Sequence, residues 1–263
     1  MQQDSKTGGR SRRTEPSFVP ALGWSALTRA YDHIMALTMR EEDWRSQFVA
    51  LVAPQPSQRI LDLRCGTGAV ALTLKRFAPG AIITGLDPDP DALMLARRKA
   101  EAEGLSVSFV EGIAQDASRL PELADKHFDR IVASLIFHHL APPGKRQALA
   151  AIAALLEPVD GRLVVLDWGP MPDLATRLRF LPVRLLDGFA NTEDNVAGRL
   201  PDLMAEAGLI VRKTAWSVET AFGPLVAWVA KGDGKRRGSR EDAENPPSVT
   251  SFERFGRNNL QQN

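Results

Sequence analysis

The residues best placed to hold a ligand form a short glycine-rich turn between positions 62 and 68. Asp62 opens this segment, and Gly66-Thr67-Gly68 closes it. Glycine has no Cβ, so the backbone at Gly66 and Gly68 can adopt positive φ and approach a bound molecule closely. A helix is expected directly after the turn, and its first N–H groups would then face the ligand. The turn is therefore predicted to bind a cofactor.

Asp87 is a second candidate, because it ends the next apolar run along the chain. A carboxylate at that place can accept hydrogen bonds from both hydroxyls of a ribose. Gly66-x-Gly68-x-x-Ala71 also loosely matches the dinucleotide fingerprint, so a nicotinamide enzyme is one alternative. The acid and the turn together predict a cofactor that contains a ribose.

His138 and His139 follow a later apolar run and are the candidates for acid–base chemistry. A histidine there could take a proton from a phenol, an amine or an activated carbon. Adjacent side chains point in different directions, so His138 is assigned the catalytic role and His139 the substrate pocket. A structural hydrogen bond is the alternative for both. Neither a catalytic triad nor a metal cluster is recognisable, and no metal is expected.

Apolar runs alternate with helical segments through the middle of the chain. This alternation predicts an α/β fold with a mostly parallel sheet and helices on both faces. The expected strands are Arg59–Leu63, Ala81–Leu86, Leu105–Val110, Phe128–Ile136 and Gly161–Leu166. The expected helices are Trp24–Leu37, Glu41–Val52, Ala69–Phe77, Asp89–Glu103, Lys145–Leu156 and Gly198–Ala207.

Two strand-like runs, Ile210–Val218 and Leu225–Ala230, close the alternating region. The turn between them is too short for the crossover that a parallel pair needs. They are therefore predicted to form a hairpin, so that the sheet ends in an antiparallel strand.

Five segments in order resemble the motifs of class I (Rossmann-like) S-adenosylmethionine-dependent methyltransferases. The first spans residues 60–68, where an acid is usually followed by Gly-x-Gly-x-Gly. The other four are Gly85-Leu86-Asp87-Pro88 and residues 111–114, 128–134 and 156–162. The nearest members are bacterial methyltransferases of the ubiquinone and menaquinone biosynthesis type. The resemblance implies a seven-stranded sheet with an antiparallel last strand, an N-terminal helical cap and S-adenosyl-L-methionine as cofactor.

The same resemblance implies roles for individual residues. Cofactor contacts fall on Asp62, Arg64, Gly66, Thr67, Gly68, Asp87, Pro88, Ile113, Ala114 and Ser134. Among these, Asp62 would lie near the ammonium group of the methionyl part and Asp87 would bind the ribose hydroxyls. The substrate pocket would be lined by Tyr31 from the cap and by His139, Asp167 and Trp168.

Two positions depart from the family pattern. Arg64 stands where the first glycine of the turn is usual, and positive φ there would cost a non-glycine residue about 1 kcal/mol or more. Its guanidinium is expected either in solvent or against a carboxylate such as Asp62. Ile113 replaces an acid that binds the adenine amino group. These changes raise an alternative function, a degenerate methyltransferase fold that acts as a cofactor-binding or regulatory protein.

The remaining expectations concern the whole chain of 263 residues. Residues 1–17 and 232–263 are expected to be disordered tails around a methyltransferase domain at 18–231, with a helical cap at 18–53 and a lid insert at 171–195. Pro182 is expected to break the helix of this insert. The net charge of +1 gives no reason to expect nucleic acid. Without a recognisable signal or membrane span, the setting is predicted to be cytoplasmic, with peripheral membrane contact left open.

The predicted function is transfer of a methyl group from S-adenosylmethionine to a small molecule, such as a lipophilic ring or quinone precursor. The sequence does not indicate the acceptor atom or the oligomeric state. A nicotinamide enzyme is disfavoured by Asp62 before the turn and by the closing hairpin.

Overall fold

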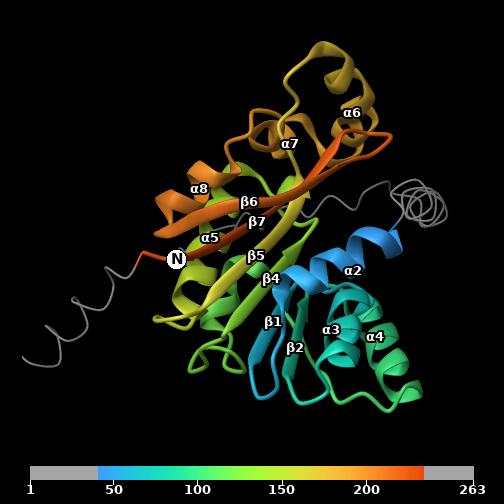
Figure 1. Cartoon of the computed structure of the whole chain (residues 1–263), viewed down its shortest axis with the longest axis vertical. Helices are drawn as coiled ribbons and strands as arrows, with labels where there is room; N and C mark the ends of the chain where they lie inside the picture. The colour runs from blue at the N-terminus through green and yellow to red at the C-terminus, as the bar shows by residue number, and fades with distance from the viewer. Residues whose placement is uncertain (1–40, 234–263) are drawn as a thin grey trace, which may run out of the picture.

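A computed structural model describes residues 41–233 of the chain. Its centre is a seven-stranded sheet with the strand order β3-β2-β1-β4-β5-β7-β6 (Figure 1). The strands are β1 Arg59–Leu63, β2 Ile82–Asp87, β3 Ser108–Glu111, β4 Arg130–Ser134, β5 Arg162–Trp168, β6 Leu209–Glu219 and β7 Pro224–Gly232. The first five strands run parallel, which confirms the predicted α/β sheet.

The hairpin at the end of the chain is also confirmed. β7 pairs antiparallel with β5 on one side and with β6 on the other. β7 is therefore the antiparallel strand, and it lies inside the sheet, while β6 forms the edge.

Helices cover both faces of the sheet. The α-helices are α2 Glu41–Val52, α3 Ala69–Phe77, α4 Pro90–Ala102, α5 Pro142–Leu155, α6 Leu174–Asp187, α7 Phe189–Val196 and α8 Leu200–Glu206, and the 3-10 helices are η1 Ala114–Arg119 and η2 Phe137–His139. One core is built by α5, α8 and η1 on the sheet, and a second by α2 and α3 on the other face. Two apolar layers of this kind bury the hydrophobic strands on both sides, as a parallel sheet requires.

Short polar and proline signals set the helix ends. The Asp89 carboxylate caps α4 by accepting hydrogen bonds from the backbone amides of Asp91 and Ala92. α5 begins at Pro142, three residues before the predicted start at Lys145, because proline suits a first helical turn, where no backbone donor is needed. The predicted helix at residues 24–37 and Tyr31 lie outside the described residues.

The expectation for Pro182 is wrong. α6 runs through Pro182 and continues to Asp187, and Gly188, with φ of 96°, ends it. Proline removes one hydrogen bond, that to the carbonyl of Leu178, and this residue is 59% exposed, so water can satisfy the freed oxygen. The predicted insert thus contains two helices, α6 and α7, which lie beyond one end of the sheet (Figure 1).

Between residues 41 and 233, none of the helices combines the length and the apolar character needed to cross a lipid bilayer. The strand order reverses between β1 and β4, where their connections leave toward opposite sides. In open sheets of this type the ligand binds beyond the carboxyl ends of the strands at that place.

Candidate functional site

The glycine-rich turn leaves β1 at the reversal point and has an unusual backbone. Arg64, Gly66 and Gly68 all have positive φ, at 61°, 53° and 81°. The Cys65 amide donates to the carbonyl of Leu86 at 2.9 Å, which ties the turn to β2. A Cβ at Gly66 would meet no atom within 4 Å, whereas one at Gly68 would lie 3.0 Å from the Cβ of Ala96. The turn is therefore packed against α4 at Gly68 and open above Gly66.

Asp62 is a buried carboxylate at the base of this turn, with 0% exposure. Neither of its oxygens accepts a hydrogen bond of ordinary geometry. Burial raises the pKa of Asp62 to about 7; the nearby Asp87 charge adds to this, and the Ala71 backbone amide opposes it. An unpaired buried carboxylate is costly, so this group is suited to a cationic ligand.

Asp87 lies beside the turn, at the end of β2, as predicted. Its Oδ2 accepts a hydrogen bond from the Gly66 amide at 2.8 Å, and its Oδ1 accepts one from the Asp89 amide at 2.9 Å. These two bonds hold the carboxylate next to the turn and leave each oxygen with a second lone pair for a ligand hydroxyl. Pro88, which stands between Asp87 and Asp89 in the sequence, is half-buried.

Arg64 is half-buried within the turn. Burial lowers the pKa of Arg64, while the charges of Asp87, Asp187 and Asp167 raise it. The Arg64 charge therefore acts on Asp87 beside the glycine turn and on Asp187 beside the histidines.

The other predicted cofactor residues lie at the same edge of the sheet. Thr67 accepts a hydrogen bond from Lys99 Nζ at 2.8 Å, through its Oγ1. Ile113 follows β3 and is 39% exposed, while Ala114 is buried at the start of η1. Ser134 is the last residue of β4 and is half-buried. This arrangement agrees with the predicted contacts, whose ligand roles remain proposals.

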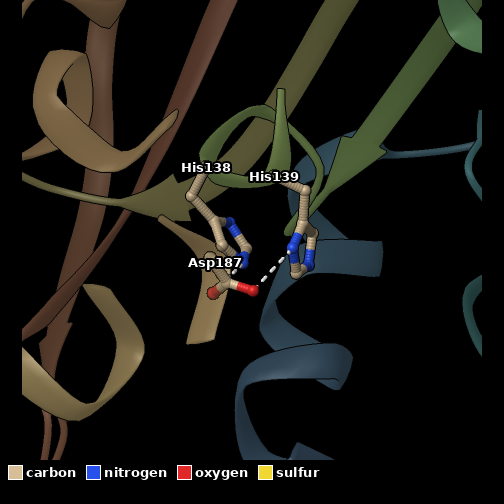
Figure 2. A group of neighbouring side chains, drawn as sticks. All are labelled: His138, His139 and Asp187. Carbon is tan, nitrogen blue, oxygen red and sulfur yellow. Dashed lines mark ion pairs between the residues drawn. The ribbon is translucent and has the colours of Figure 1, made fainter. Parts of the chain in front are cut away.

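The two histidines lie together on η2. Their ring centroids are 4.0 Å apart, and both rings approach Asp187 at the end of α6 (Figure 2). His139 Nδ1 is 2.9 Å from Asp187 Oδ1, and His138 Nε2 is 3.8 Å from Asp187 Oδ2. The expectation that the two side chains point different ways is thus wrong, because the tight 3-10 turn turns both toward the insert. The sequence analysis missed Asp187, since only folding brings it to η2.

Asp167 holds His138 from the opposite side. Its Oδ1 lies 2.8 Å from His138 Nδ1, and the same carboxylate accepts backbone bonds from Phe137 and Trp168. The Asn195 side-chain amide donates to it at 3.0 Å. Although burial opposes ionisation, these partners keep the pKa of Asp167 below its ordinary value. Asp167 therefore orients His138 and does not face a pocket directly.

Trp168 is 1% exposed and packs edge-on against both the His138 and Phe180 rings. It thus supports the histidine and joins it to α6. The predicted pocket residues His139, Asp167 and Trp168 do come together, with His139 the most exposed of the three, at 31% of its side chain.

The electrostatic state of the cluster follows from its burial. Burial and the neighbouring His138 lower the pKa of His139 to about 4, although Asp187 acts in the opposite direction. The pKa of Asp187 is also lowered: burial opposes this, but its hydrogen bond to His139 prevails. At neutral pH the cluster therefore contains a neutral His139 imidazole and an ionised carboxylate.

A buried lysine holds α7 beside the histidine cluster. Lys145 has 0% exposure, and its Nζ donates to the carbonyl of Asn191 at 2.6 Å and to Asp194 at 3.1 Å. A third bond, to Asn195 at 3.3 Å, links this lysine to the residue that holds Asp167. The sequence analysis gave Lys145 no role, because an ordinary helical lysine has no distinguishing signal before α7 is placed beside it.

Known proteins resemble this chain in sequence and in fold. Residues 60–159 match the family model described as a methyltransferase domain. The demethylmenaquinone methyltransferase of Thermus thermophilus is 42% identical over 151 residues, 57% of this chain and 66% of that protein. The chain contains a methyltransferase domain.

Further comparisons agree with this methyltransferase domain. The ubiquinone/menaquinone biosynthesis C-methyltransferase UbiE of Paracoccus denitrificans is 34% identical over 129 residues, 49% of this chain and 50% of that protein. The N-methyltransferase NodS of Bradyrhizobium japonicum, solved with S-adenosyl-l-homocysteine, shares the fold with a TM-score of 0.56 and 18% identity, over 73% of this chain and 87% of NodS. The chain spans between half and two thirds of the length of these two curated relatives.

Proposed function

We propose that the protein transfers a methyl group from S-adenosylmethionine to a small lipophilic acceptor of the hydroquinone kind. The methyltransferase domain, the glycine turn and the names of the curated relatives support this proposal. The cofactor supplies a methyl group on a sulfonium, a leaving group that is already activated. The protein then has to hold the acceptor in line and remove its proton.

The unpaired Asp62 carboxylate is the observation that carries the proposal. Neither of its two buried oxygens accepts a hydrogen bond of ordinary geometry, and a ligand ammonium would satisfy them. The open space over Gly66 leaves room for the methionyl chain, and Asp87 beside it offers free lone pairs to ribose hydroxyls. These residues fit the cofactor, with Thr67, Gly68, Pro88, Ile113, Ala114 and Ser134 around it.

The acceptor site is proposed at the histidine cluster. Asp167 binds Nδ1 of His138, which places the proton on that nitrogen and leaves the Nε2 lone pair free. We assign to Nε2 the removal of the acceptor's proton. The Arg64 charge acts on Asp187 of this cluster and on Asp87 beside the turn, so we assign to it the stabilisation of negative charge as it develops on the acceptor.

The lid insert supports a lipophilic acceptor. Four leucines with helical spacing form an exposed stripe on α6: Leu174, Leu178, Leu181 and Leu185, at 70%, 59%, 37% and 66%. Such a stripe suits contact with an apolar molecule or with the surface of a membrane that stores it. Peripheral membrane contact is part of the proposal for this reason.

Mass spectrometry with a deuterium-labelled methyl donor tests the function. The full chain is incubated with labelled S-adenosylmethionine and a reduced naphthoquinone that lacks its ring methyl group. We expect a labelled methyl group on the ring, none on the oxidised quinone, and strongly reduced product with Asp62→Asn. Tight cofactor binding without product from any acceptor in a cell extract would instead favour the alternative, a cofactor-binding or regulatory protein.

A further inference from the structure

His138, His139 and Asp187 offer three potential metal ligands to one point. One ligand atom from each residue can be chosen so that all three lie within 4.8 Å of one another. The side chains come from η2 and from the end of α6, and Figure 2 shows both imidazoles turned toward the carboxylate. Residues this distant in sequence converge here because α6 folds back over the end of the sheet.

The spacing of these atoms is close to that of a coordination site. Ligands about 2.0–2.1 Å from a tetrahedral ion lie about 3.3 Å from one another. Asp187 lies 2.9 Å from His139 Nδ1 through its Oδ1 and 3.8 Å from His138 Nε2 through its Oδ2, and these two distances lie on either side of this value. Small side-chain rotations would therefore bring the three donors into place.

The surroundings of His138 match those of a metal-binding histidine. Such histidines usually donate their second ring N–H to a carboxylate, which fixes the tautomer and the ring orientation. Asp167 does this at 2.8 Å, and Asn195 and two backbone amides hold Asp167 in turn. The lone pair on His138 Nε2 is thus directed toward Asp187 by a carboxylate that is itself fixed.

The charge around the cluster also favours a cation. Asp167 and Asp187 bring two negative charges, and Arg64 opposes them with one positive charge. Lys145 is bonded to Asp194, which also pairs with Arg199, and neither cation contacts the histidines. Among the groups that contact the two imidazoles directly, Asp167 and Asp187, the charge that a divalent cation would meet is negative.

We propose that His138, His139 and Asp187 bind a divalent transition-metal ion of the zinc type, with an open position for an oxygen of the acceptor. Two imidazoles and one carboxylate are the donor set of many catalytic zinc sites, and three protein ligands leave room for a fourth. His139 binds through Nδ1, so its proton moves to Nε2.

The inference rests on the proposed function for the identity of the acceptor, but the cation site itself does not. A hydroxyl bound at the open position releases its proton to water more readily. In the metal-loaded protein His138 Nε2 would hold the cation instead of removing the proton, and the cation would join Arg64 in stabilising the deprotonated acceptor. A metal site of this kind would therefore favour methyl acceptors that carry a hydroxyl group near the atom that is methylated.

Titration of the metal-free full chain with Co²⁺ tests the site, because the visible absorption of Co²⁺ reports nitrogen and oxygen ligands. We expect one equivalent to bind, to show tetrahedral bands and to be displaced by Zn²⁺. Asp187→Asn and His139→Ala should abolish these bands, and Asp167→Asn should weaken binding about 10–100-fold. His127→Ala, which changes an exposed histidine outside the cluster, should bind as the unaltered protein does.

Absence of the bands, or bands that persist in Asp187→Asn, would overturn the proposal. Circular dichroism and a parallel titration with S-adenosylhomocysteine show whether each variant is folded. The same titrations distinguish the metal-site proposal from the proposed methyl transfer. Adenosyl ligand binding without Co²⁺ binding refutes only the metal site, whereas Co²⁺ binding without adenosyl ligand binding refutes only the proposed function.

Discussion

Substitution of Asp62 by asparagine should stabilise the ligand-free protein at neutral pH while it weakens cofactor binding. The side chain is fully buried, and its pKa is raised from 3.8 to about 7. The folded state therefore holds this proton more tightly than the unfolded chain does. The protonated Asp62 side chain makes its full contribution to the free energy of unfolding below about pH 4. This contribution is lost as the pH rises toward about 7 and the buried group ionises.

The expected gain in the free energy of unfolding follows from the difference between the two pKa values of Asp62. The difference between 3.8 and about 7 corresponds to about 4 kcal/mol, and relaxation of the site reduces it, so we expect about 2–4 kcal/mol. Asparagine has nearly the same shape and no charge, so it avoids this cost. The free energy of unfolding of Asp62→Asn should exceed that of the unaltered protein above about pH 7, and the difference should shrink toward about pH 4.

Urea unfolding between about pH 5 and about pH 8 measures this difference. Asp125→Asn makes the same chemical change at an exposed position and should leave the pH dependence unaltered. With S-adenosylhomocysteine added, the order should reverse, because only the carboxylate pairs with the ligand ammonium. An Asp62→Asn protein that is less stable by the same amount at every pH would refute the reasoning, since Asp62 would then have a structural partner.

Four further substitutions test the backbone strain, the packing, the buried ion pair and the proposed base one at a time. Arg64→Gly should be more stable than Arg64→Ala by about 1 kcal/mol in urea unfolding, because only glycine removes the cost of φ at 61°. Gly68→Ala should lose at least about 1–2 kcal/mol, since the new Cβ would lie 3.0 Å from Ala96 at positive φ; unchanged stability would contradict this. Lys145→Met should cost about 1–3 kcal/mol, because Asp194 then keeps only its pair with Arg199, and a second substitution that neutralises this acid should restore part of the loss. Finally, His138→Ala should lower the turnover number about 10²–10⁴-fold with little change in cofactor affinity, and an unaltered rate would exclude it as the base.

The sequence was sufficient for the sheet because its signals are local. The apolar run before Asp62 predicts β1 with its observed bounds, and the closely spaced runs at the end of the chain predict the hairpin. The glycine turn and Asp87 were also predictable, since both lie directly at strand ends. Pro182 was misleading because its cost depends on whether the freed carbonyl reaches water, which the sequence does not show.

The acceptor side of the site was less predictable, because it is assembled from distant segments. Asp187 reaches the histidines, and Asn195 reaches both Asp167 and Lys145, only when α6 and α7 fold back over the sheet. The environment of Arg64 was unpredictable for the same reason, since its carboxylate neighbours come from three different elements. Local motifs thus indicated where the cofactor binds, while the acid–base cluster required the tertiary structure.

Calorimetric titration of the full chain with S-adenosylmethionine, with NAD as the matched control ligand, measures whether the glycine turn and Asp62 bind an adenosyl cofactor. We expect one binding site for the adenosyl compound, micromolar or tighter, with affinity that rises as the pH approaches about 7 and Asp62 ionises. We expect no binding of NAD and loss of the pH dependence in Asp62→Asn. Absent or millimolar binding of S-adenosylmethionine, or preferential binding of NAD, would contradict this expectation.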